Sequence, residues 1–79
     1  MRYRARQGAT LGDEGSHPVR VIVFLALSPR ARTAREIAEV LDRPLGTVAY
    51  HLRVLVDLGV VDEVPADEDE VEEVPLKDL

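Results

Sequence analysis

The sequence predicts a mostly α-helical α+β domain in which three helices are followed by a β-hairpin. Three observations support this prediction. Between residues 17 and 58, apolar side chains recur at helical spacing in three segments, each bounded by capping or helix-breaking residues. After Gly59 the pattern changes to short runs rich in valine, which are typical of strands. The chain has 79 residues, enough for one small domain.

The first helix is predicted to begin at His17-Pro18, because proline is favoured at the first helical position. Ser16 or His17 is the candidate cap. Ser28-Pro29 is expected to end the helix, and the proline start favours a helix over a buried strand. Its apolar positions are Val19, Ile22, Val23, Ala26 and Leu27. Residues 1–16 contain three glycines without periodicity, so we expect them to form a flexible N-terminal arm.

The second helix is predicted from a capping box at its start. Thr33 stands at the cap position and Glu36 three residues later, so each side chain can bond a backbone N–H of the other. One apolar face follows, and Asp42-Arg43 marks the break before the next helix. The residues of that face are Ile37, Ala38, Val40 and Leu41.

The third helix is expected to begin at Pro44 or Leu45 and to end at Gly59, which can adopt positive φ. An apolar stripe predicts the side that faces the core, namely Leu45, Val48, Leu52 and Leu55. The opposite side would then face outward, and it carries Gly46, Thr47, Tyr50, His51 and Arg53.

Residues 60–64 and 71–74 predict the two strands of a hairpin around the acidic turn 67–70. Two short helices joined by a tight break and followed by such a hairpin predict a winged helix-turn-helix. In this fold the third helix can present its outer face to a DNA major groove. We divide the chain into the arm 1–16, the core 17–64, and an acidic wing and tail at 65–79.

Composition and charge exclude several classes of protein. The net charge is −5, but residues 17–56 carry six arginines and three acidic residues, whereas residues 57–79 carry ten acidic residues and one lysine. The absence of cysteine excludes disulfides and zinc fingers. Two isolated histidines do not form a metal site, and the acidic pairs lack any accompanying nucleophile or phosphate-binding loop. We therefore predict no enzyme activity, no metal and no cofactor.

The longest apolar run, residues 21–27, is too short to cross a membrane, and no apolar stretch follows the first arginines as in a secretion signal. The expected location is the cytoplasm. An apolar surplus on the first helix also predicts a homodimer formed through that helix. The residues of this surplus are Val21, Phe24 and Leu25.

The segment His17–Val64 resembles the winged helix-turn-helix of ArsR-type bacterial and archaeal repressors. The resemblance is carried by His17-Pro18-Val19-Arg20, by Thr33–Ala38, and by Thr47–Leu55 with Gly59-Val60-Val61. It implies a dimeric transcriptional regulator that binds double-stranded DNA and inserts a recognition helix, residues 45–58, into the major groove. The DNA-binding residues it implies are Thr33, Arg35, Arg43, Leu45, Gly46, Thr47, Tyr50, His51 and Arg53.

Each of these residues also has a simpler interpretation. His51 can be a partly buried helix residue, Tyr50 a half-exposed structural residue, and Arg35 a partner of Glu39 one turn away. The sequence departs from the family at Pro44, Gly46 and Ala49, where polar or hydroxyl side chains are usual, and its wing is acidic where relatives are basic.

The acidic wing leaves a second function open, a winged-helix module that binds a basic protein surface and not DNA. The tail could also point away from DNA, compete with DNA for the arginines of the chain, or reflect adaptation to high salt. Arginines gathered on the recognition face, with the acidic residues elsewhere, would favour DNA. Acidic residues around the recognition helix would favour a protein partner.

Overall fold

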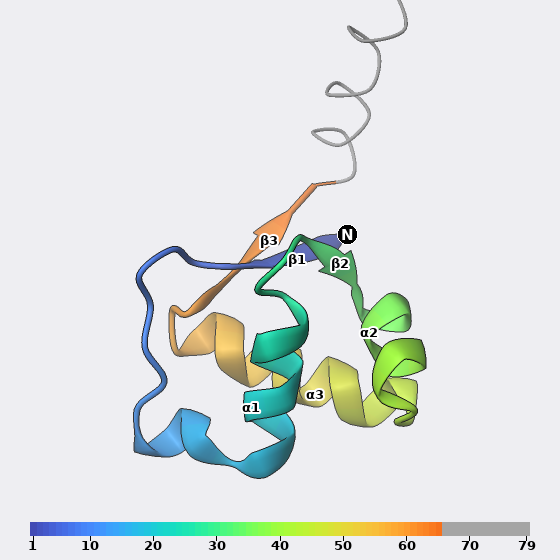
Figure 1. Cartoon of the computed structure of the whole chain (residues 1–79), viewed down its shortest axis with the longest axis horizontal. Helices are drawn as coiled ribbons and strands as arrows, with labels where there is room; N and C mark the ends of the chain where they lie inside the picture. Colours follow the sequence, from blue (N-terminus) through green and yellow to red (C-terminus); the bar gives the residue numbers. More distant parts are fainter. Residues whose placement is uncertain (66–79) are drawn as a thin grey trace, which may run out of the picture.

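The computed structural model describes residues 1–65, without the side chains of residues 14 and 15. Three helices pack beneath a small antiparallel sheet (Figure 1), which confirms the predicted winged helix-turn-helix fold. In chain order the elements are β1 (Arg2–Ala5), the 3₁₀ helix η1 (Asp13–Ser16), α1 (Pro18–Ala26), β2 (Arg32–Thr33), α2 (Ala34–Leu41), α3 (Leu45–Asp57) and β3 (Val61–Val64).

The predicted helix boundaries are confirmed, and each has a local cause. His17 caps α1, because its Nδ1 accepts a hydrogen bond from the Val19 amide at 3.2 Å. At α2 the capping box is complete: the Glu36 amide donates to Thr33 Oγ1 at 3.1 Å, and the Thr33 amide donates to Glu36 Oε1 at 2.8 Å. Asp42, with φ 54°, turns the chain into the left-handed region and ends α2.

The third helix packs its apolar stripe against α1 and α2, where Val48, Leu52 and Leu55 are fully buried. The predicted stripe is wrong at its first member, because Leu45 is 45% exposed in the first turn of α3. The corresponding prediction for α2 is wrong at Val40, which is also exposed.

His51 was expected on the outer face of α3, and this expectation is wrong, because His51 is only 6% exposed. The reason is its spacing: His51 follows Val48 by three residues and precedes Leu55 by four, which places all three on one side of the helix.

The N-terminal segment differs most from the prediction. Arg2–Ala5 forms the central strand of the sheet, whose order is β2-β1-β3, so the expectation of an unstructured arm is wrong for these residues. Tyr3 and Ala5 pack against the core. The alternation of arginine with Tyr3 and Ala5 was the available signal for a strand with one buried face.

The first predicted strand of the hairpin is present as β3, but it pairs with β1 and not with a following strand of the described region. Arg2 lies opposite Val64 in this antiparallel pair, and Ala5 lies opposite Val61. The second predicted strand, residues 71–74, lies outside the described residues. Gly59 has φ 80°, as expected for the turn that leads into β3.

An aliphatic core joins the three helices to the sheet and thereby fixes which side of α3 is left uncovered. The buried core residues are Val23, Leu27, Ile37, Ala38, Val48, Leu52, Leu55, Val60 and Val61.

Within residues 1–65, no helix is long and apolar enough to cross a membrane.

Candidate nucleic-acid interface

The outer face of α3 is open to solvent. Tyr50 is 58% exposed, and Thr47 and Arg53 are exposed beside it. These three side chains lie opposite the buried stripe, so the packing that holds α3 in place also presents them outward. The structure therefore leaves three of the predicted contact residues of α3 exposed away from the core, while Leu45 and Gly46 stand in the first turn of the helix.

The N-terminal end of α3 is also accessible. Its cap residue, Pro44, offers no side-chain hydrogen bond, and the first turn contains no acidic residue. A Cβ added at Gly46 would meet no atom within 4 Å, so open space surrounds this residue. The first amides of a helix lack partners within the helix and carry a partial positive charge, which suits them to bind a phosphate.

Two predicted residues stand at the start of α2. The hydroxyl oxygen of Thr33 already accepts the Glu36 amide, so only its hydroxyl hydrogen is available to an incoming acceptor. Arg35 is exposed at the second position of the helix. The alternative pairing of Arg35 with Glu39 is not present as an ion pair in the structure.

Arg43 follows the left-handed turn at Asp42 and is exposed, with its amide bonded to the Ala38 carbonyl. Thus Arg35, Arg43 and Arg53 come from α2, from the turn and from α3. Among the ion pairs within residues 1–65, none engages any of these three guanidinium groups. Their charge is available to an external anion.

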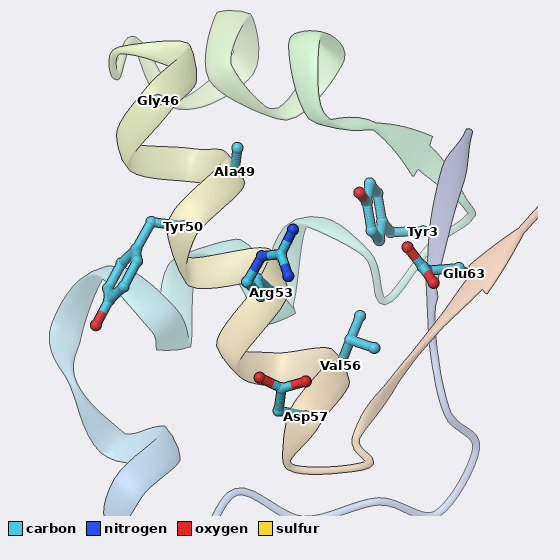
Figure 2. Close-up of a pocket in the computed structure, with 8 residues that line it drawn as sticks. All are labelled: Tyr3, Gly46, Ala49, Tyr50, Arg53, Val56, Asp57 and Glu63. Atoms are coloured by element: carbon cyan, nitrogen blue, oxygen red, sulfur yellow. The ribbon is translucent and has the colours of Figure 1, made fainter.

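A groove of about 430 Å³ separates α3 from the strands β1 and β3 (Figure 2). Arg53 extends from α3 toward the strands, and Tyr3 and Glu63, paired across β1 and β3, face it from the other side. The residues that line the groove are Tyr3, Gly46, Ala49, Tyr50, Arg53, Val56, Asp57 and Glu63.

The groove is not uniformly basic. Asp57 and Glu63 place two carboxylates around the C-terminal half of α3, whereas the first turn of the helix carries none. The charge therefore changes along the helix, from a first turn without acidic residues to a C-terminal half beside two carboxylates. Sequence reasoning missed this groove because Tyr3 and Glu63 reach it only through the pairing of β1 with β3.

The acidic residue Asp62 of β3 is partly compensated by arginines in β1 and directly after it. Arg6 donates from Nε to Asp62 Oδ2 at 3.2 Å and from a second nitrogen to Oδ1. This hydrogen bond lowers the pKa of Asp62 below its usual value. Arg4 lies opposite Asp62 in the register. Hence the described part of the wing carries less uncompensated negative charge than its sequence suggests.

His51 connects α3 to α1 instead of facing outward. Its Nδ1 accepts a hydrogen bond from Arg20 Nε at 3.2 Å, and its ring centroid lies 4.9 Å from that of His17. Burial lowers the pKa of His51, and the neighbouring His17 and Arg20 lower it further. The neutral imidazole is thus the form that accepts this hydrogen bond.

These features define a winged helix-turn-helix in which the outer face of the third helix is exposed. Residues 16–64, more than half of the chain, match the family described as a helix-turn-helix domain, and the chain belongs to this family. Strand β1 precedes the matched segment. Members of the family are typically non-enzymatic regulators. No curated protein and no solved structure matches the chain significantly.

Proposed function

We propose that this protein is a DNA-binding transcriptional regulator of the ArsR type, acting in the cytoplasm, with α3 as its recognition helix. The observation that carries the proposal is the exposed face of α3, with an N-terminal end that has no side-chain cap and with arginines that no ion pair within residues 1–65 engages. A helix of this kind can enter a major groove that is about 12 Å wide.

The proposed contacts follow from this placement. The amides of Leu45 and Gly46 would meet a phosphate, as helix N-termini do. Thr47, Tyr50 and Arg53 would face the major groove of the DNA, since they occupy the exposed side of α3.

The start of α2 and the turn before α3 would contact the DNA backbone through Thr33, Arg35 and Arg43. Of the predicted contacts, His51 takes a different part in the proposal: from its buried site it would hold α3 against α1. It is therefore a positioning residue.

We further propose a homodimer formed through α1, which would suit a DNA site with two-fold symmetry. Leu25 is 57% exposed on this helix and is the strongest candidate contact. Phe24, which the sequence placed in the same patch, is half-buried and packs against the core of its own chain. The proposed interface is therefore centred on Leu25.

Binding to mixed-sequence duplex DNA, measured by fluorescence anisotropy over a salt series, tests the proposal. Phosphate contacts release counterions, so affinity should fall steeply as salt rises. Arg53→Gln should weaken binding, because it removes the guanidinium group without a large change in volume. Absence of binding by the wild-type protein at low salt would overturn the proposal.

A second candidate function has its own support. Asp57 and Glu63 lie in the groove beside α3, where they would suit a basic protein surface better than a phosphate backbone. The acidic segment 65–79, also predicted to bind a protein partner, lies almost entirely outside the described residues. If the protein does not bind DNA at low salt, this protein-interaction module becomes the better account.

A further inference from the structure

The first two turns of α3 expose a surface that is almost entirely apolar. Leu45 is 45% exposed, Tyr50 is 58% exposed, and Ala49 is exposed as well. Residues three and four apart on a helix are neighbours, so Ala49 adjoins Leu45 and Gly46. Tyr50 adjoins Gly46 by the same spacing, and Figure 2 shows Ala49 and Tyr50 projecting from α3 below Gly46. We call Leu45, Ala49 and Tyr50 the apolar face of α3.

This part of α3 lacks the side chains that read purine bases through two hydrogen bonds. Arginine and lysine read guanine in this way, and asparagine and glutamine read adenine. None of these four residue types occurs in residues 44–52. His51 is buried, and its Nδ1 already accepts a hydrogen bond from Arg20. The exposed hydrogen-bonding side chains of these two turns are therefore the hydroxyl groups of Thr47 and Tyr50.

Arginines stand before and after the apolar face. Arg43 precedes α3 and Arg53 lies in its third turn, and both are exposed. No ion pair within residues 1–65 engages either guanidinium group. An apolar surface between two cations suits the major groove of a DNA duplex, where phosphates border a floor that carries methyl groups. An apolar protein surface would leave both cations without an anion.

We propose that the apolar face of α3 contacts the 5-methyl groups of thymine, so that the protein selects DNA sites with thymine at the contacted positions. This inference rests on the proposed function, in which α3 enters the major groove. Thymine is the base that presents a methyl group there, and apolar side chains such as alanine recognise it. Because Gly46 has no side chain, the helix can approach closely enough for the short Ala49 side chain to reach a base.

Replacement of thymine by deoxyuridine tests the proposal. Deoxyuridine keeps every hydrogen-bonding group of thymine and lacks only the 5-methyl group. A library of randomised duplexes is first enriched, at low salt, for the sequences that the wild-type full chain binds most tightly. The enriched sequences are then copied once with thymidine triphosphate and once with deoxyuridine triphosphate, and both copies are compared by fluorescence anisotropy. Burial of one methyl group corresponds to about fourfold in affinity, so the wild type should bind the thymine copy about fourfold or more tightly.

Three variants locate the contact on the protein. Ala49→Ser replaces a methyl group with a hydroxyl group of similar size and should reduce the ratio of the two affinities. The double variant Ala49→Ser/Tyr50→Ser should bind the two copies equally. Val40→Thr makes a similar methyl-to-hydroxyl exchange at an exposed site of α2 and should keep the full ratio of the wild type. Because each variant is judged by a ratio, a general loss of affinity does not affect the comparison.

Equal binding of both copies by the wild type would overturn this inference and leave the proposed DNA-binding function standing. A wild-type ratio that persists in Ala49→Ser and in the double variant would also overturn it, because the methyl group would then act through the shape of the DNA. Failure of the wild type to bind or enrich any duplex at low salt would refute the proposed function itself, and this inference with it.

Discussion

Gly46→Ala is expected to make the protein more stable and its DNA binding weaker. A Cβ at this position meets no atom within 4 Å, so the substitution has no steric cost in the folded chain. Alanine is favoured over glycine in a helix by about 0.5–1 kcal/mol. For a domain of this size, that gain corresponds to a rise in melting temperature of about 2–8 °C.

The same methyl group would stand between the Gly46 amide and an approaching phosphate. A hydrogen bond to a charged group contributes about 1.5–3 kcal/mol, so its loss should lower DNA affinity about tenfold or more. Thermal unfolding and fluorescence anisotropy on the same samples measure both effects.

Gly12→Ala is the matched control for this experiment, because Gly12 also has no atom within 4 Å of an added Cβ and precedes the 3₁₀ helix far from α3 in the sequence. It should leave DNA affinity unchanged. If Gly46→Ala bound DNA as tightly as the wild type, the first turn of α3 would not be a phosphate site. A lower melting temperature of the Gly46→Ala variant would refute the inference that alanine is favoured over glycine at residue 46 as in a helix.

Three further predictions follow from particular side chains. Burial, and then the two basic side chains beside it, lower the pKa of His51, so its contribution to stability is present above the unfolded pKa of about 6.5 and is lost as the pH falls through the folded pKa. Urea unfolding between pH 7.5 and 5 should show this loss, and His51→Gln should reduce the pH dependence. Arg53→Gln should lower the slope of log affinity against log salt by about one, and an unchanged slope would exclude a phosphate contact by this side chain. Leu25→Asp should convert a dimer to a monomer in sedimentation experiments. Val40→Asp, at an equally exposed site on α2, should leave the dimer intact.

The pairing of β1 with β3 changes how the charge of this protein should be interpreted. Taken along the sequence, Asp62 and Glu63 make the wing acidic and would oppose DNA binding. In the folded chain Asp62 is engaged by Arg6, whereas Glu63 faces the groove beside Arg53. The first turn of α3 therefore lacks acidic residues, a pattern that favours DNA, whereas the C-terminal half lies beside carboxylates, a pattern that favours a basic protein partner. The salt series decides between them.

The helices could be predicted from the sequence because each boundary depends on a few adjacent residues. Pro18 and the His17 side chain begin α1, the Thr33–Glu36 capping box begins α2, and the positive φ of Gly59 ends the helical region. These interactions join atoms within four residues of each other. The resemblance of residues 17–64 to a known family added the expectation that α3 faces DNA.

The tertiary structure alone decided the position of the N-terminal strand, the groove and the hydrogen-bond partner of His51. Tyr3 reaches the groove only because β1 pairs with β3, some 60 residues away in the chain. The spacing of His51 from Val48 and Leu55 indicates the buried side of α3, but its hydrogen-bond partner there, Arg20, comes from another helix. Hydrogen bonds within a helix end depend on neighbours in sequence, whereas strand partners and buried polar groups depend on which distant segments the core brings together.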